Sequence, residues 1–231
     1  MIQLIGLFTI SWILIYFFEK GNLSVLGFVP TKDRLKYFTI LFMVSTFFSA
    51  TAFLLRMYIA REEYTISQSL SLSSIVLETW YQFRSVLTEE LICRGVLLYI
   101  LIKKIGQVKA ILVSSVFFAA MHWLNAGVWG NWTQMTILFA FTFAMGLLLA
   151  YSFARTFSLL IPFAIHFGWN LTQNYIFPDT ATGNHIFTLV VPPPTVTISY
   201  MAFFTMLLFP KISVLVFDYL IVKQHRQMDA P

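Results

Sequence analysis

Long runs of apolar residues separated by short polar stretches dominate the chain from its first residues to its last. Within these runs apolar and polar residues do not alternate strictly, which favours helices over the strands of a membrane barrel. Each run is close to the roughly 20 residues that a helix needs to cross the hydrocarbon core of a bilayer. The pattern predicts an all-α fold with about seven membrane-spanning helices, at 2–18, 37–55, 83–102, 110–124, 133–153, 157–177 and 195–222.

A polar stretch at 61–80 precedes the third predicted helix. Within it Leu72, Ile75, Val76 and Thr79 recur at helical spacing and continue to Phe83. We expect an amphipathic helix on the membrane surface here. The chain shows no internal repeat and no long linker, so we expect one integral membrane domain over 1–231.

Composition supports a membrane protein. The chain is 58% hydrophobic and 11% charged, whereas a soluble domain carries about 25% charged residues. No Lys, Arg, Asp or Glu occurs in 110–154 or in 156–178. The net charge of +5 does not indicate a nucleic-acid partner, because the basic residues lie in short clusters between the apolar runs. The single cysteine, Cys93, excludes an internal disulfide and a multi-cysteine metal site.

The basic residues also predict an orientation. They fall in alternate loops, which places those loops and the C-terminus in the cytoplasm of a multi-pass cell-membrane protein, with the N-terminus outside. Arg56 and Arg61 are exceptions, partly offset by neighbouring glutamates. The residues that set the orientation are Lys20, Lys32, Arg34, Lys36, Lys103, Lys104, Lys109, Arg155, Lys223 and Arg226.

Three ionisable residues stand in the middle of the third predicted helix: Glu89, Glu90 and Arg94. A charge at the centre of a spanning helix costs at least about 2.5–3.5 kcal/mol on insertion scales. Glu90 and Arg94 are four residues apart, share a face and can pair. Glu89 is rotated by about 100° from Glu90, so we expect its carboxylate to remain available for chemistry. A purely structural ion cluster that joins helices is the alternative.

Two other predicted helices contribute histidines. His122 lies near the end of 110–124, and His166 lies inside 157–177 with Asn170 on the same helix face. A lone buried histidine can simply form an interhelical hydrogen bond. Counted along the predicted helices, however, Glu89, His122, His166 and Asn170 all lie about 14–21 Å from a helix end. We therefore expect all four to reach a similar depth in the bilayer.

The order of these residues resembles the three-motif signature of the CAAX-protease and bacteriocin-processing (CPBP, or Abi) family, which includes prenyl-protein endopeptidases of the Rce1 type. The motifs are Glu89-Glu90-x-x-x-Arg94, Phe118-x-x-x-His122 and His166-x-x-x-Asn170, and Gly95 also fits. The resemblance covers about 85–170.

The resemblance implies an intramembrane endopeptidase with its catalytic core at about 83–177. Glu89 would act as general base on water, helped by His122, while His166 and Asn170 would hold the oxyanion. Glu90 and Arg94 would order the helix and position Glu89. The substrate would be a peptide or protein at or in the bilayer, with or without an attached lipid, such as a prenylated C-terminus or a leader peptide.

Metal dependence is open at this point. Glu89, His122 and His166 form a plausible set of ligands for a divalent metal such as zinc, with a fourth position for water, as in a metalloprotease. We expect no obligatory metal or other cofactor, because the family's structural picture favours water activated by a glutamate.

Two other functions fit a membrane protein with these residues. One is a non-enzymatic immunity or regulatory protein of the same fold. The other is a small proton-coupled transporter, in which Glu89 and the histidines would relay protons.

Overall fold

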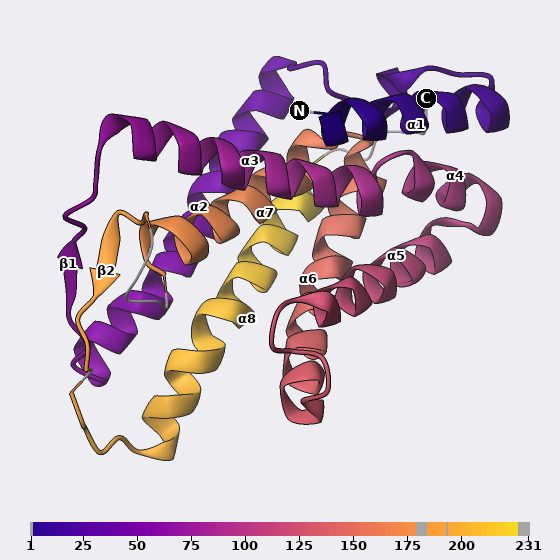
Figure 1. The fold of residues 1–231 in the computed structure, drawn as a ribbon. Helices are drawn as coiled ribbons and strands as arrows, with labels where there is room; N and C mark the ends of the chain where they lie inside the picture. The colour runs from indigo at the N-terminus through magenta and orange to yellow at the C-terminus, as the bar shows by residue number, and fades with distance from the viewer. Residues whose placement is uncertain (1, 179–183, 193, 226–231) are drawn as a thin grey trace. The chain divides into compact units, whose positions relative to one another are not determined.

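The protein, seen in a computed structural model, is almost entirely helical (Figure 1). The structure describes residues 2–178, 184–192 and 194–225; Arg226, used in the orientation argument, lies outside them. The helices are α1 (Ile2–Glu19), α2 (Lys32–Ile59), α3 (Leu72–Arg94), α4 (Val96–Ile105), α5 (Gln107–Met121), α6 (Trp132–Thr156), α7 (Leu160–Leu171) and α8 (Tyr200–Gln224). Short elements are η1 (Leu23–Leu26), η2 (His122–Leu124), the π-helical η3 (Thr172–Ile176), and strands β1 (Tyr64–Ile66) and β2 (Phe187–Leu189). The predicted all-α fold is confirmed.

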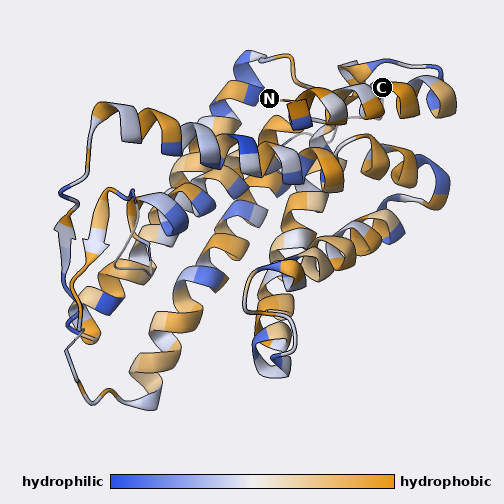
Figure 2. Ribbon diagram, viewed as in Figure 1, coloured by the Kyte–Doolittle hydropathy of each residue, from blue (hydrophilic) through white to orange (hydrophobic). Residues whose placement is uncertain are grey.

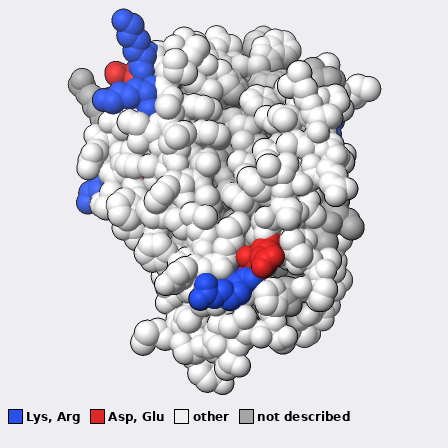
Figure 3. Space-filling view, turned by 90° about the vertical axis from the view of Figure 1, so that its left-hand side faces the viewer, with Lys and Arg blue, Asp and Glu red and all other residues white. Residues whose placement is uncertain are grey.

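Five segments of the described chain are long and apolar enough to cross a membrane: α1, α2, α5 continued through η2 (Gln107–Leu124), α6 and α8. Figure 2 shows apolar residues along the whole length of these helices. On the face in Figure 3 the charged residues are confined to a few small patches, and most of the surface carries no charge. These features indicate a multi-pass membrane protein.

The predicted helices at 83–102 and 157–177 are each interrupted. The first ends at Arg94, because Gly95 approaches the preceding turn closely: a Cβ on Gly95 would lie 2.2 Å from the carbonyl oxygen of Leu91. The second starts late, since Phe157 takes a left-handed φ of 42° and α7 has only 12 residues. The depths counted along continuous helices for Glu89, His166 and Asn170 are therefore wrong.

The stretch at 61–80 is only partly helical. Its periodic residues from Leu72 onward form the start of α3, which continues without a break to Arg94. The residues before them form β1, which pairs antiparallel with β2, Tyr64 opposite Leu189 and Ile66 opposite Phe187. The prediction of a separate amphipathic helix is wrong, because the same helix that begins with this periodicity also carries Glu89.

The chain divides into two compact units. Unit 1 comprises Met1–Phe38, Leu87–Phe163 and Tyr219–Pro231, and unit 2 comprises Thr39–Val86 and Ala164–Asp218. The prediction of one domain over 1–231 stays a prediction.

Unit 1 is built on α1, α4, α5 and α6. Its core includes the fully buried side chains of Leu98, Tyr99 and Phe153. α5 packs against α6, and a Cβ on Gly146 would lie 3.1 Å from Cα of Ser115, so small residues allow the two backbones to approach closely. The core thus holds α5, whose last turn leads into His122.

In unit 2, small polar residues of α2 hold α7. Thr46 Oγ1 donates to the carbonyl oxygen of Gly168 at 3.4 Å, and Ser49 Oγ donates to that of Trp169 at 3.1 Å. Ser45 Oγ also donates to the buried carboxyl group of Asp218 in α8 at 2.6 Å. Such hydrogen bonds join helices where hydrophobic burial against lipid tails gives little driving force.

Candidate active site

The end of α3 carries a buried ion pair. Arg94 Nη1 donates to Glu90 Oε1 at 3.0 Å, and both side chains are 0% exposed. This confirms the predicted pairing across one helical turn. A buried pair is costly to break because each charge left alone would be uncompensated, so the pair fixes the turn of α3 in which Glu89 stands.

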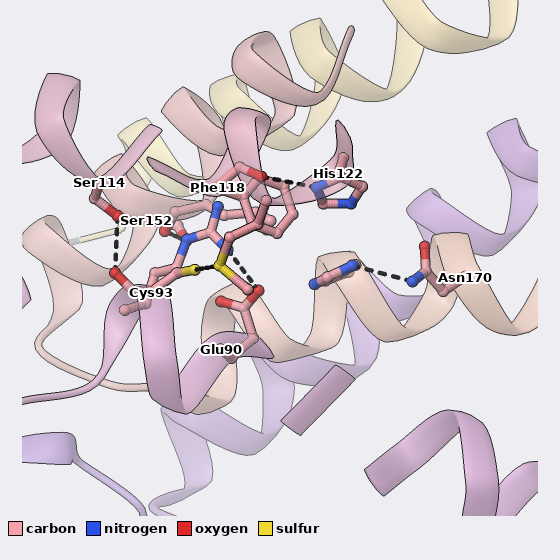
Figure 4. Close-up of polar contacts among 11 residues, drawn as sticks. Glu90, Cys93, Ser114, Phe118, His122, Ser152 and Asn170 are labelled. Atoms are coloured by element: carbon pink, nitrogen blue, oxygen red, sulfur yellow. Dashed lines mark hydrogen bonds and ion pairs between the residues drawn. The ribbon is translucent and has the colours of Figure 1, made fainter. Parts of the chain in front are cut away.

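The same pair attaches α3 to α5. The guanidinium group of Arg94 lies over the ring of Phe118, 3.9 Å from its centroid (Figure 4). Arg94 Nε and Nη2 are buried and have no hydrogen-bond partner among the described residues, so this cation–π contact is a main compensation for the charge. Ser114 Oγ donates to the carbonyl oxygen of Cys93 at 2.8 Å, and Cys93 Sγ lies 3.9 Å from Met121 Sδ. These contacts join the last turns of the two helices.

His122 is oriented by α5. Its Nδ1 lies 2.7 Å from the carbonyl oxygen of Phe118, and its ring packs edge-on against the Phe118 ring at 4.5 Å. Because a carbonyl oxygen can only accept, Nδ1 carries the proton, and in the neutral ring Nε2 holds the lone pair. His122 is thereby held in the tautomer that can accept a proton or hydrogen bond at Nε2.

Glu89 precedes Glu90 in α3 and is half-buried, unlike its fully buried neighbour. Glu89 and His122 both belong to unit 1. Glu89 stands one turn before the last turn of α3, and His122 directly follows the last residue of α5. The Arg94–Phe118 contact joins these two helices close to both residues.

His166 and Asn170 form a second pair, in α7 of unit 2. Asn170 Nδ2 lies 3.1 Å from His166 Nε2, His166 is 3% exposed, and Asn170 is half-buried (Figure 4). An amide nitrogen can only donate, so His166 Nε2 accepts and the proton of a neutral ring is on Nδ1. The prediction that these residues share a helix face is confirmed.

The structure thus forms two local pairings of the predicted residues, Glu90 with Arg94 in unit 1 and His166 with Asn170 in unit 2. The resemblance implies that Glu89 and His122 act together with His166 and Asn170 in one catalytic site, and this stays a prediction. Within the described residues of each unit, no three His, Cys, Asp or Glu side chains are close enough together to hold a metal ion. The metal dependence also stays a prediction.

A family model, described as type II CAAX prenyl endopeptidase Rce1-like, matches residues 68–172. The matched segment is similar to this family and makes up less than half of the chain. The matched range contains all six candidate residues, from Glu89 to Asn170, and confirms the resemblance seen in the motifs. The matched family is one of CAAX prenyl endopeptidases, and the five apolar segments indicate a multi-pass membrane protein independently of that match. No curated protein and no solved structure matches the chain.

Residues outside the three motifs also support α7, and the apolar pattern of the sequence did not reveal them. Gly168 lies between the two motif positions of α7, and a Cβ there would be 2.6 Å from the carbonyl oxygen of Phe42. Ser45 of α2 also lies close to Gly168, and Ser49 bonds to the carbonyl oxygen of the next residue, Trp169. The two serines occur four residues apart in an apolar run. Small polar residues at that spacing in a membrane helix are a signal of helix–helix contact.

Proposed function

We propose that the chain is a glutamate-dependent intramembrane endopeptidase, and that Glu89 is its general base. The observation that carries this proposal is the Rce1-like match over 68–172, which contains every residue of the three motifs. Glu89 takes a proton from a water molecule as the water oxygen attacks the carbonyl carbon of the peptide bond. The proton then goes to the leaving amine nitrogen, so that hydrolysis yields a free carboxyl group and a free amine.

His122 assists Glu89 in this proposal. Its Nδ1–H is engaged by the Phe118 carbonyl oxygen, so Nε2 accepts a hydrogen bond from the attacking water. Anchoring one ring nitrogen to fix the tautomer of the other is a common way to prepare a catalytic histidine.

Asn170 and His166 bind the oxyanion of the tetrahedral intermediate. One amide hydrogen of Asn170 is directed to His166 Nε2, and an amide group has a second hydrogen to donate. In the neutral tautomer His166 adds a donor at Nδ1. Removing one oxyanion donor costs other hydrolases about 10²–10³ in kcat, so these two residues can supply a large part of the catalysis.

Glu90 and Arg94 are positioning residues. Both are fully buried, and together they attach the last turn of α3 to Phe118. Their role is to hold the backbone of Glu89 at a fixed height and rotation beside the end of α5.

The substrate in this proposal is a peptide or protein held at or in the cell membrane, such as a prenylated C-terminus or a leader peptide. The basic loops and the C-terminus face the cytoplasm, and no metal is obligatory. The membrane setting is supported by the five apolar spans, and the peptide substrate by the family match.

The test uses the full chain reconstituted in liposomes with a fluorogenic peptide library that includes prenylated and unmodified members. Glu89→Gln keeps the shape and removes the base, and should lower kcat by about 10²–10⁴-fold. Asn170→Ala should lower kcat by about 10²–10³-fold. Glu78→Gln makes the same change three turns earlier in α3, outside the proposed site, and should cleave like the wild-type protein.

Cleavage by Glu89→Gln at the wild-type rate would refute Glu89 as the base. If the wild-type protein cleaves no member of the library and instead moves protons across the liposome in a Glu89-dependent manner, the chain is a transporter. If it does neither and Asn170→Ala retains its measured function, a non-enzymatic membrane protein remains.

A further inference from the structure

The turn that follows α7 is the π-helix η3, and it carries Asn174 about one turn beyond Asn170. The Phe177 N–H donates to the carbonyl oxygen of Thr172 at 2.9 Å, five residues earlier in the chain. Such widened turns are rare and occur frequently at functional sites. Both α7 and η3 belong to unit 2, so η3 directly continues the helix of the proposed oxyanion donors.

Asn174 contacts a glutamine of α3. Its Nδ2 donates to Gln82 Oε1 at 3.4 Å, which is longer than the usual range of about 2.7–3.2 Å. Gln82 is 7% exposed, Asn174 is exposed, and both belong to unit 2. A hydrogen bond of this length contributes little to stability, so holding two helices together does not account for a buried amide at this position.

The amide group of Gln82 has more hydrogen-bonding capacity than this contact uses. It has two N–H donors, and its oxygen can accept two hydrogen bonds. Among the described residues the contact with Asn174 is the one hydrogen bond that the Gln82 side chain makes. Its Nε2 is not among the sealed polar atoms of the described chain. Buried amide donors are normally satisfied, so Gln82 is suited to a further partner that can approach Nε2.

The chemistry of the two amides favours a peptide backbone as that partner. Both side chains are uncharged, so they offer no counter-charge to an ion. In an extended chain the N–H and C=O of one residue point to the same side, and a carboxamide can accept from the first and donate to the second.

The position along the chain fits a substrate held at Asn170. Asn174 is four residues further on, about 6 Å along a helix axis. An extended peptide advances about 3.3–3.6 Å for each residue, so the two amides lie about two residues away from a carbonyl group bound at Asn170.

We propose that Gln82 and Asn174 bind the backbone of the substrate peptide about two residues from the cleaved bond. Gln82 Oε1 accepts from the N–H of that substrate residue, and Gln82 Nε2 donates to its C=O. Asn174 holds the Gln82 amide in the required orientation through their existing contact. This inference rests on the proposed function, because the register is counted from the oxyanion donors.

The first test measures binding without cleavage. The Glu89→Gln chain is placed in lipid nanodiscs, and fluorescently labelled members of the peptide library are bound to it, with empty nanodiscs as the blank. Anisotropy selects the tightest-binding peptide, which is remade with one N-methyl group at each backbone nitrogen in turn. We expect one N-methyl position to weaken binding about three- to tenfold, as the loss of one hydrogen bond does.

The same measurement is repeated with Gln82→Leu added to the Glu89→Gln chain. The parent peptide should bind about three- to tenfold more weakly. The sensitive N-methyl group should have no further effect, because its partner is already absent.

The second test measures cleavage in the otherwise wild-type chain. Gln82→Leu should raise KM about three- to tenfold and leave kcat nearly unchanged, since the contact is equal in the ground state and the transition state. Gln134→Leu is the matched control, because it makes the same change at an exposed position of α6 in unit 1; it should leave KM and kcat unchanged. Asn174→Ala at its exposed position should also raise KM, which keeps the test decisive if Gln82→Leu does not fold.

Four results would overturn the subsite and leave Glu89 as the base. They are an unchanged KM in both Gln82→Leu and Asn174→Ala, an N-methyl effect that persists in Gln82→Leu, a sensitive position remote from the predicted register, and a fall in kcat and melting temperature at constant KM. The last would make Gln82 a structural link between α3 and η3. Conversely, Gln82-dependent binding of a peptide that the wild-type chain does not cleave would retain the peptide site and refute the proposed hydrolysis. The absence of both binding and cleavage would refute both.

Discussion

Replacing Gly168 with alanine tests the close approach of α2 to the helix that carries His166 and Asn170. A Cβ at Gly168 would lie 2.6 Å from the carbonyl oxygen of Phe42 and 3.1 Å from Thr46 Oγ1. Both neighbours belong to α2, and the nearer one is backbone that cannot turn aside. We therefore expect the added methyl group to force α2 and α7 apart.

Gly6→Ala in α1 gives the reference for this prediction, since no atom lies within 4 Å of a Cβ at Gly6. Alanine in place of glycine in a helix gains up to about 1 kcal/mol of helix propensity at either position. Overpacking at Gly168 costs about 1–3 kcal/mol, and the propensity gain cancels in the comparison. In a chain of this size the melting temperature falls by about 2–4 °C for each kcal/mol of lost stability. Gly168→Ala should therefore melt roughly 2–12 °C below Gly6→Ala.

The assay is thermal unfolding of both variants in the same detergent, followed by intrinsic tryptophan fluorescence, with peptide cleavage measured in parallel. Cleavage by Gly168→Ala should also fall, because Asn170 stands half a turn further along α7. Should Gly168→Ala melt at or above the temperature of Gly6→Ala, the contact between α2 and α7 would be looser than the structure has it.

Three further predictions concern buried charge and metal. Arg94→Met leaves Glu90 without its cation and should lower stability by about 3–5 kcal/mol, whereas Glu90→Leu with Arg94→Met should recover most of that loss in chemical denaturation. Asp218→Asn keeps an acceptor for Ser45 and should unfold like the wild-type protein, while Asp218→Leu leaves the hydroxyl unsatisfied and should lose about 1–3 kcal/mol. Dialysis against 1,10-phenanthroline should leave cleavage unchanged; a loss that zinc restores would establish a metalloprotease.

The fold class was predictable because the length and composition of apolar runs directly reflect the bilayer. Helix boundaries were less accessible where a single residue decides them. The break after Arg94 depends on how closely Gly95 approaches the carbonyl oxygen of Leu91. The late start of α7 depends on the left-handed backbone conformation of Phe157. In an apolar run neither glycine nor phenylalanine by itself predicts the end of a helix. Hydropathy alone therefore predicted one continuous helix at 83–102 and another at 157–177.

At the candidate site, sequence spacing predicted contacts within a helix and missed contacts between helices. The Glu90–Arg94 pair follows from the four-residue spacing. The position of Phe118 under the guanidinium group of Arg94 does not follow from sequence spacing, because it depends on the register of α3 against α5. The hydroxyl groups that hold α7 were missed for the same reason, because each depends on a partner remote in sequence.

All three motifs share a spacing of four residues, and the structure gives this spacing one physical meaning. In each motif a polar contact joins two residues across one helical turn. The distance is 3.0 Å between Arg94 and Glu90, 2.7 Å between His122 and the Phe118 carbonyl oxygen, and 3.1 Å between Asn170 and His166. In each motif one partner restrains the other before any substrate arrives. Such restraint is what electrostatic catalysis needs, because donors and bases that are already oriented do not have to reorganise during the reaction. Glu89 is the motif residue outside these three contacts. It directly precedes Glu90, whose ion pair with Arg94 restrains the backbone there. The carboxyl group of Glu89 is half-buried, so it can still contact water.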